Sequence, residues 1–155
     1  MIDAKVPDGL PKWMTDHIDT YIKSGGKDGH MYKLTVPGRP AGIVPALLLV
    51  TKGRKSGAKY IFPLFYGEAD GGYFVIASKG GAPDHPGWYK NLKVHPDVEL
   101  QVGEKTIKAK ARTVPAGAKR DALWKQAVGF FAPYAEYQEK AGDREIPVVM
   151  LDPVH

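Results

Sequence analysis

The sequence predicts a mainly β (α+β) fold, in which a small barrel of antiparallel strands is surrounded by peripheral helices. Three observations support this prediction. Short apolar runs at strand spacing dominate the chain from Leu47 onward, helical segments fall between hairpins without alternating regularly with the strands, and the 155 residues include 18 Gly and 13 Pro. This glycine and proline content is typical of short elements joined by many turns. The irregular placement of helices argues against a doubly wound parallel sheet.

The N-terminal part is expected to contain a single helix. Residues 1–10 are expected to form a loose leader, and apolar residues recur at helical spacing from Pro11 to Lys23, where Ser24-Gly25-Gly26 ends the helix. We favour a helix that packs on the domain, and the alternative is an interfacial helix on a membrane. Residues 24–45 are rich in Gly, Pro and Lys, which predicts a long mobile connection.

The next segment contains the first strands of the predicted sheet. A buried strand, Leu47 to Val50, is followed by strands over 60–66 and 73–77. Asp84 is the expected N-cap of a short helix in which Pro86 is an early residue. The order of these elements places two glycine-rich turns at strand ends.

The C-terminal half is expected to add a hairpin, two helices and a last strand. The hairpin strands cover 98–102 and 106–113, and the outer face of the second strand is cationic. Pro115 opens the first helix, Pro133 opens the second, and a strand over 146–151 follows.

Composition excludes several classes of function. The chain has no cysteine, which excludes disulfides, thiolate nucleophiles, zinc ribbons and iron–sulfur clusters. The five histidines show no metal-ligand spacing, no serine stands in a nucleophile elbow, and no paired carboxylates indicate hydrolysis. The net charge of +5 favours an anionic partner. The sequence lacks a signal peptide and a spanning run, which predicts a cytoplasmic protein, with contact to a membrane surface as an alternative.

Two turns combine cations with glycine at the ends of strands. They are Gly53-Arg54-Lys55-Ser56-Gly57 and Ser78-Lys79-Gly80-Gly81. Glycine lets backbone approach a ligand, arginine forks onto phosphate or carboxylate, and lysine and serine add a charge and a donor. A single turn of this kind is more often part of the solvated surface than a binding site. Two in one sheet favour a cradle for an anionic tail, with a cofactor carrying the demanding chemistry.

Apolar and aromatic residues near these turns predict a wall for a flat ring. The run from Phe62 to Phe65, together with Ala77, supplies a dry surface, although Leu64 alone is better explained as core. Trp88 and Tyr89 stand beside Asn91 in the short helix. Two tyrosines near the C-terminus, Tyr134 and Tyr137, either line a substrate entrance or form the packed face of their helix.

Four motifs together resemble a known family. They are Gly53-Arg54-Lys55-Ser56-Gly57, Ala77-Ser78-Lys79-Gly80-Gly81, Pro86-x-Trp88-x-x-Asn91-Leu92-x-x-x-Pro96 and Asp143-Arg144-x-Ile146-Pro147-Val148. In this order, over about residues 35–153, they resemble the deazaflavin (coenzyme F420)-dependent nitroreductase and quinone reductase family. The resemblance implies a split β-barrel, similar to FMN-binding split barrels, and coenzyme F420 as cofactor.

The resemblance also implies site residues. Ser78, Tyr134 and Tyr137 are the expected catalytic residues, with Ser78 bonding the ring or acceptor and Tyr137 or solvent supplying a proton. The expected cofactor contacts are Arg54, Lys55, Ser56, Tyr60, Ile61, Phe62, Pro63, Leu64, Phe65, Ile76, Ala77, Ser78, Lys79, Gly80, Gly81, Gly87, Trp88, Tyr89, Lys90 and Asn91. Phe65 and Phe131 stand where some nitro-reducing members have tyrosines, which argues against reduction of bicyclic nitroimidazoles.

The expected function is therefore hydride transfer from reduced coenzyme F420 to a quinone, an unsaturated ketone (enone) or a nitro compound. An N-terminal helix and connection, 1–34, would precede a cofactor-binding barrel, 35–155, and the helix would touch membrane in members that reduce menaquinone. The first alternative is an FMN-dependent split-barrel oxidoreductase. The others are a non-enzymatic basic barrel on a membrane surface or on nucleic acid, although aromatics do not interleave with the cations at 108, 110 and 112 as base stacking requires.

Overall fold

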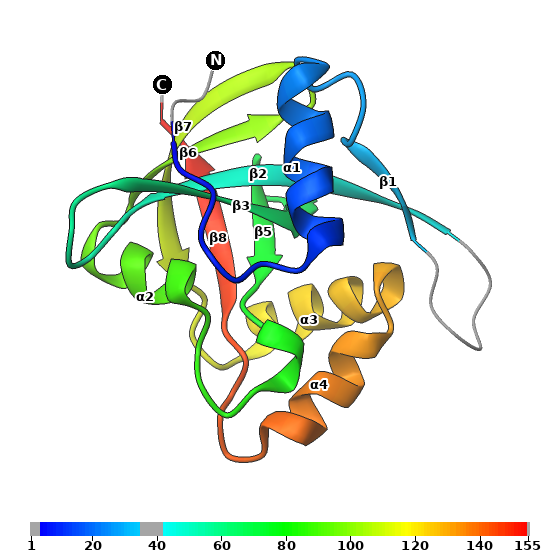
Figure 1. Cartoon of the computed structure of the whole chain (residues 1–155). Coiled ribbons are helices and arrows are strands. Elements are labelled where there is room, and N and C mark those ends of the chain that lie inside the picture. Colours follow the sequence, from blue (N-terminus) through cyan, green and yellow to red (C-terminus); the bar gives the residue numbers. More distant parts are fainter. Residues whose placement is uncertain (1–3, 35–41, 155) are drawn as a thin grey trace.

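A computed structural model describes residues 4–34 and 42–154, which form one curled antiparallel sheet with helices around it (Figure 1). The sheet has eight strands in the order β1-β2-β6-β7-β8-β5-β4, and β3 pairs with β2 outside this path. The predicted antiparallel barrel with peripheral helices is confirmed. The strands are β1 Met31–Leu34, β2 Gly42–Lys52, β3 Lys59–Phe65, β4 Gly67–Ala69, β5 Gly72–Ile76, β6 Asp97–Val102, β7 Lys105–Thr113 and β8 Val148–Pro153. The helices are α1 Lys12–Lys23, α2 Gly87–Val94, α3 Ala118–Phe130, α4 Pro133–Ala141 and the 3-10 helix η1 Lys79–Gly81.

Strand β2 is the centre of the sheet because it pairs with β1, β3 and β6. Its apolar run is buried on both faces, as alternate side chains of a strand point to opposite sides. Leu47 and Leu49 belong to the main core with residues of β6, β7 and β8. Leu48 and Val50 pack on the other side against a smaller cluster that includes residues of α1.

Helix α1 packs on the sheet, as we favoured from its sequence. Ile18 and Tyr21 are fully buried against β2 and β3. The Tyr21 hydroxyl shares its single proton between the carbonyl oxygens of Ala46 and Gln101, at 3.0 and 3.1 Å, and accepts from Gly103 N at 2.7 Å. Trp13, at the start of the helix, leaves 48% of its surface exposed.

The N-terminal part differs from prediction in two places. Lys5 forms a bridge with Tyr60, in which Lys5 N donates to Lys59 O and Ile61 N donates to Lys5 O at 2.8 and 2.9 Å, so the expected leader is docked on β3. The expected connection contains β1, and β2 begins at Gly42 rather than Leu47. Strand β1 and the first part of β2 form because their backbones pair with each other, whatever the polarity of their side chains. Residues 35–41 of that connection lie outside the described residues.

The remaining differences concern the ends of elements. Pro86, not Asp84, occupies the N-cap position of α2, because Asp84 bonds His85 N and pairs with Lys90 instead. Strand β4 was not predicted, α3 begins at Ala118 rather than at Pro115, and β8 covers 148–153 rather than 146–151.

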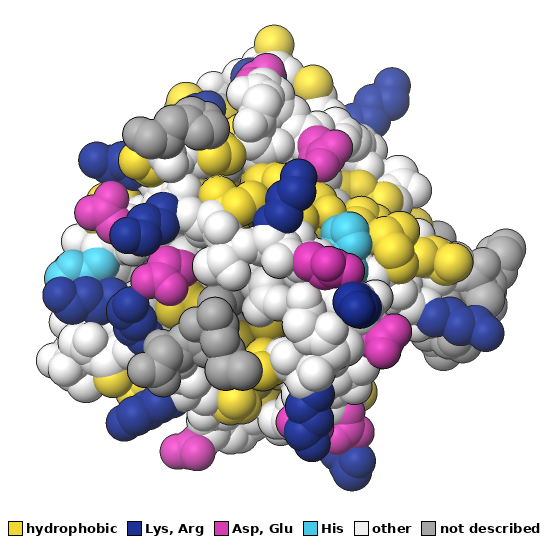
Figure 2. All heavy atoms as spheres, turned by 90° about the horizontal axis from the view of Figure 1, so that it is seen from above, with side chains coloured by type: hydrophobic (Ala, Val, Ile, Leu, Met, Phe, Trp, Pro, Cys, Tyr) yellow, Lys and Arg dark blue, Asp and Glu magenta, His cyan; other side chains and the backbone are white. Residues whose placement is uncertain are grey.

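The face of the molecule seen from above mixes charges (Figure 2). Lys and Arg side chains alternate there with Asp and Glu around an apolar strip. None of the helices in the described ranges has an apolar stretch long enough to cross a membrane.

Candidate functional site

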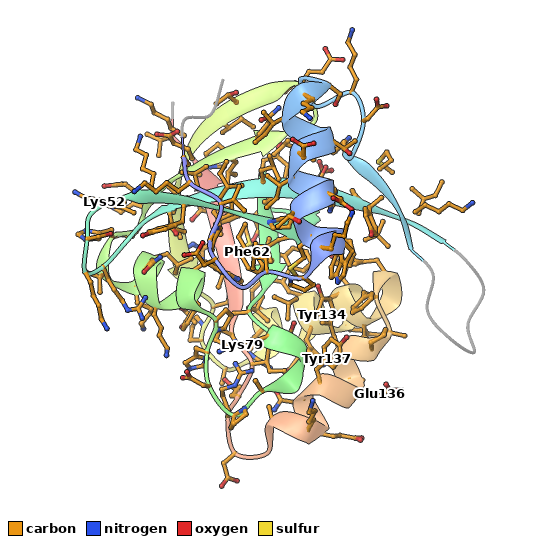
Figure 3. All side chains as sticks on the ribbon, in the orientation of Figure 1. Lys52, Phe62, Lys79, Tyr134, Glu136 and Tyr137 are labelled. Carbon is orange, nitrogen blue, oxygen red and sulfur yellow. The ribbon has the colours of Figure 1, made fainter. Side chains whose placement is uncertain are left out.

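A cavity of about 900 Å³ lies where β3, η1, α2, α4 and the N-terminal segment meet. Phe62 of β3, Lys79 of η1, and Tyr134 and Tyr137 of α4 gather around this region although they come from three different elements (Figure 3). The lining residues are Pro7, Asp8, Leu10, Pro11, Trp13, Met14, His17, Thr51, Gly53, Arg54, Lys55, Ser56, Tyr60, Ile61, Phe62, Pro63, Leu64, Phe65, Ile76, Ser78, Lys79, Gly80, Pro86, Gly87, Trp88, Asn91, Phe131, Tyr134 and Tyr137.

One cationic rim of the cavity is the turn between β2 and β3, residues 53–57. The turn is closed by bonds from Gly53 N to Ala58 O at 2.6 Å and from Gly57 N to Gly53 O at 2.9 Å. Gly57 has a φ of 74°, a left-handed conformation that glycine adopts without strain. The Ser56 hydroxyl accepts from Ala58 N at 3.2 Å, so the backbone of this rim is fixed by its own hydrogen bonds.

The buried side chain of Asn91 on α2 holds Arg54 in place. Asn91 Oδ1 accepts from Arg54 Nη1 at 2.8 Å and from Arg54 N at 3.2 Å. Asn91 Nδ2 donates to the hydroxyl of Thr51 at 3.2 Å, which fixes the orientation of the amide. The guanidinium of Arg54 is therefore positioned at the cavity before any ligand arrives.

The second cationic rim is the segment of Ser78 and η1, residues 78–81. Lys79, Gly80 and Gly81 have φ values of 47°, 62° and 80°, three left-handed residues in succession. A side chain at Gly81 would place its Cβ 2.5 Å from Tyr137 O, so the segment lies directly against α4. Ser78, Lys79 and Gly80 line the same cavity as the first rim.

The two rims converge, as the sequence predicted. Arg54 and Lys55 from one rim and Lys79 from the other line a single cavity. Among the residues that the structure describes, neither Lys55 nor Lys79 forms an ion pair with an acidic side chain. Unpaired cations at a concave surface attract an anionic ligand and hold it by charge-assisted hydrogen bonds.

The wall between the rims is apolar and comes from β3. Phe62 packs near Trp88 with ring centroids 6.3 Å apart, and Phe65 packs near Phe131 at 5.4 Å. Leu64, for which we favoured core packing, contacts the main core while half-buried and also lines the cavity. A flat ring fits against such a surface.

Four of the predicted cofactor contacts do not line the cavity. Ala77, the residue after β5, is buried in the main core, whereas its neighbours Ile76 and Ser78 line the cavity. On α2, Trp88 and Asn91 face the cavity, whereas the two residues between them turn away. Tyr89 instead forms a hydrogen bond with Thr113, and Lys90 pairs with Asp84. The fourth residue, Gly81, is covered by α4.

The N-terminal segment contributes lining residues that sequence reasoning missed. Trp13, Met14 and His17 of α1 face the cavity, and Pro7 and Leu10 lie before them. The signal available in the sequence was a tryptophan at the start of an amphipathic helix, from which we predicted packing on the domain or, as the alternative, contact with a membrane, and not a cavity.

His17 itself is buried beside this part of the cavity. Its Nε2 bonds Gly29 O at 2.8 Å, and its Nδ1 has no hydrogen-bond partner among the described residues. Burial lowers the pKa of His17, so the imidazole is neutral near pH 7.

Tyr134 and Tyr137 of α4 close the cavity on the side opposite α1. Tyr134 is 5% exposed and packs against Phe131 with ring centroids 4.8 Å apart. Burial is the main cause that raises the pKa of both tyrosines above the ordinary value of 10.0. Both hydroxyls therefore stay protonated near neutral pH and are hydrogen-bond donors.

These residues fit a ligand with an anionic tail and a flat ring, the chemistry of a deazaflavin. The cations lie at the rims, the apolar wall lies between them, and the tyrosine donors lie beside the wall. Within the described ranges, no group of three His, Asp or Glu residues is close enough to hold a metal ion.

Comparison with known proteins gives consistent results. The family described as F420H(2)-dependent quinone reductase matches residues 13–153. The F420H(2)-dependent quinone reductase Rv1261c of Mycobacterium tuberculosis (strain ATCC 25618 / H37Rv) is 35% identical over 153 residues, covering 92% of this chain and 97% of that protein.

Two solved structures are also similar. One, described as an F420-H2 dependent reductase (FDR-A), has 46% identity and a TM-score of 0.63 over 70% of this chain and 94% of that chain. The other, described as a domain-swapped dimer, has 40% identity and a TM-score of 0.65 over 90% of this chain and 97% of that chain.

Proposed function

Because the chain belongs to the F420H(2)-dependent quinone reductase family, we propose that its cavity binds reduced coenzyme F420 beside a quinone-type acceptor and promotes hydride transfer between them. The predicted enzyme class and cofactor are confirmed by this membership, which favours the deazaflavin over the FMN alternative. The observation that carries the assignment of the cavity is that both cationic rims and the apolar wall line it.

The roles of the residues follow from their positions. Lys55, Lys79 and the oriented guanidinium of Arg54 hold the anionic tail, because each presents a positive charge at the rim. Phe62 and Leu64 hold the ring and exclude water from one of its faces. When bound, the reduced coenzyme supplies a hydride from its C5 atom. The protein contributes by positioning the two reactants, and good orientation lowers a barrier by several kcal/mol or more.

Hydrogen bonding and proton supply are assigned to Ser78 of the second rim and to α4, which lies against that rim. Ser78, two residues after the end of β5, lines the cavity and is the proposed hydrogen-bond partner of the ring or the acceptor oxygen. Tyr137 is the proposed proton donor to the reduced acceptor, since burial keeps its hydroxyl protonated and it lines the cavity. Solvent entering the open cavity is the alternative donor.

The acceptor class can be narrowed from the lining. Apolar and aromatic side chains from α1, β3 and α4 suit a quinone ring or an unsaturated ketone. Phe65 and Phe131 pack together and offer no hydroxyl to a nitro group. We therefore expect quinone and enone reduction to exceed reduction of bicyclic nitroimidazoles.

A titration tests the cavity assignment. Oxidised coenzyme F420 is added to the purified protein while its fluorescence is followed, and turnover of the reduced form is then measured with menadione. Lys55→Ala and Lys79→Ala should each weaken binding about tenfold, the effect of losing one charged hydrogen-bond partner. Lys110→Ala, which removes the same charge from the exposed face of β7, is the control. Unchanged affinity in both cavity variants would contradict the assignment.

Contact with a membrane and a cytoplasmic location stay predictions. Trp13 is half-exposed, which supports a contact, but Lys12 and Lys23 are paired with Asp16 and Asp19 on the same helix. These pairs weaken attraction to anionic lipid. Vesicle co-sedimentation of the wild type and of Trp13→Ala tests the contact, and equal pelleting of both would argue against a role of this helix.

A further inference from the structure

The motif Asp143-Arg144-x-Ile146-Pro147-Val148 contributes no lining to the cavity, yet its arginine contacts the cavity rim. Arg144 Nε donates to Ala82 O at 2.8 Å, Nη1 donates to Ala77 O at 3.1 Å, and Nη2 donates to Ser78 O at 2.7 Å. One guanidinium thus binds three backbone carbonyls that flank η1. Its planar, fixed set of five N–H donors suits this task, whereas a lysine carries its three donors on a single nitrogen.

The segment that Arg144 binds needs an external constraint. Its own backbone bonds are few, from Gly81 N to Ser78 O at 2.9 Å and from Ala82 N to Lys79 O at 3.2 Å. Lys79 has a φ of 47°, which side chains other than glycine adopt only where surrounding contacts impose it. The backbone conformation at Lys79 decides where its ammonium lies at the rim.

Arg144 is itself attached to α4. Gln138 Nε2 donates to Arg144 O at 2.9 Å, and Gln138 Oε1 accepts from Ile146 N at 2.9 Å. Gln138 follows Tyr137, which lines the cavity. The arginine therefore connects the second cationic rim with the tyrosine-bearing helix α4, against which that rim lies.

A histidine completes the cluster. His85 Nδ1 lies 3.0 Å from Arg144 Nη1, and because a guanidinium only donates, Nδ1 is the acceptor and the imidazole is neutral. The charged groups that act on His85 are Arg144, Asp84, Lys90 and Lys93, and the ring of Tyr89 packs beside it at 4.9 Å. Protonation of His85 would replace this hydrogen bond by repulsion between two cations.

From these contacts we propose that Arg144 is a positioning residue, which fixes the Ser78–Ala82 segment in the shape that binds the anionic part of the cofactor and ties that segment to α4. The inference rests on the proposed function of the cavity. It assigns to Arg144 no contact with cofactor or acceptor. It predicts that Arg144 acts through Lys79 and not through Lys55, because the first rim has its own anchor in Asn91.

A double-mutant cycle tests the inference, with the dissociation constant of oxidised coenzyme F420 as readout. Arg144→Ala should weaken binding about 10- to 100-fold, the loss expected for one hydrogen bond from a charged donor. Combined with Lys79→Ala, the effects should be less than additive, because a displaced segment already misplaces Lys79. Combined with Lys55→Ala, they should add. General destabilisation of the fold would change both pairs alike.

Two further measurements keep the inference falsifiable if Arg144→Ala folds poorly. Arg144→Lys retains the charge. Without cofactor, the backbone amides of Gly81 and Ala82 should exchange hydrogen faster in this variant than in the wild type, whereas the amide of Gly57 should exchange at the same rate in both. In the wild type, binding should weaken on acidification as His85 takes up a proton, and His85→Asn should reduce that dependence.

The outcomes are distinguishable. Failure of the wild type to bind coenzyme F420 overturns the proposed function and the inference with it. Binding by the wild type, with unchanged affinity and exchange in the Arg144 variants or equal coupling to both lysines, overturns the inference alone.

Discussion

Replacement of Asn91 by aspartate tests whether Arg54 faces an anion. Asn91 is the single asparagine of the chain, is 7% exposed, and accepts from Arg54 Nη1 at 2.8 Å. Asn91→Asp nearly conserves the shape of the side chain, so the turn and α2 should keep their geometry. It places a carboxylate beside the guanidinium and neutralises the charge that we assign to the cofactor tail. Arg54 lowers the pKa of this new carboxyl, which is therefore ionised at pH 7.

The expected magnitude follows from electrostatics. A carboxylate about 6 Å from a bound anion repels it by roughly 3 kcal/mol at an effective dielectric constant of about 20. Solvent and salt screen the open side of the cavity, so about half of this, ~1.5 kcal/mol, is a reasonable expectation. That energy is about a tenfold increase in the Kd of coenzyme F420. Folding stability should change little, since the guanidinium pairs with the new carboxylate and the Thr51 hydroxyl can donate to the oxygen that replaces Nδ2.

The assay is a fluorescence titration with oxidised coenzyme F420 at low and at high salt, with urea denaturation alongside. The variant should bind more weakly and lose part of its salt dependence, because one attractive charge has been cancelled. Gln126→Glu, on the exposed face of α3 outside the cavity, adds the same charge as a control. If Asn91→Asp binds as tightly as the wild type while remaining folded, Arg54 does not contact the anionic part of the cofactor.

Three further predictions concern stability. Gly81→Ala should destabilise the fold by about 1–3 kcal/mol in urea, because its φ of 80° disfavours alanine and the new Cβ would lie 2.5 Å from a backbone carbonyl. Gly80→Ala, with a φ of 62° and open space around it, should cost less, and equal losses would refute the steric argument. Tyr21→Phe should cost about 1–3 kcal/mol by leaving buried groups without their partner, with no change in cofactor Kd, which calorimetry can check. Stability should also fall on acidification. Burial lowers the pKa of His17 below its ordinary 6.5, so the unfolded chain binds a proton at a higher pH than the folded protein does. The loss of stability therefore begins near pH 6.5 and levels off below the pKa of the folded protein. In His17→Gln the slope between pH 7.5 and 5.5 should be smaller, with a remainder from His85, whose pKa is lowered in the same direction, and an unchanged slope would count against this account.

Much of the site could be predicted because its chemistry is written in short local segments. Glycines beside Arg54 and Lys79 mark turns, and their placement at strand ends brings them to one side of the sheet. The sequence did not determine which residues within a segment face the cavity. The period of α2 turns Tyr89 and Lys90 away from the cavity, a distinction that follows from helix geometry once the start of the helix is known at Gly87.

The docking of the segment before α1 could not be predicted, for a physical reason. Lys5 docks on β3 through backbone hydrogen bonds, which leave no trace in side-chain pattern. Strand β1 pairs with β2 in the same way, although Lys33 and its neighbours show little apolar alternation. Long-range backbone pairing of this kind depends on where other strands lie, and a single sequence does not specify it.

The four motifs of the sequence acquire a common explanation when they are sorted by what they touch. Two of them, the turn with Arg54 and the segment with Lys79, present charges to the cavity. The other two supply the holders: Asn91 binds the guanidinium of Arg54, and Arg144 binds the carbonyls around Lys79. Each holder comes from an element distant in sequence, so each rim is oriented by packing of the whole domain rather than by its own turn. Because an oriented charge loses less entropy on binding than a mobile one, this arrangement explains why residues remote from a ligand should affect its affinity.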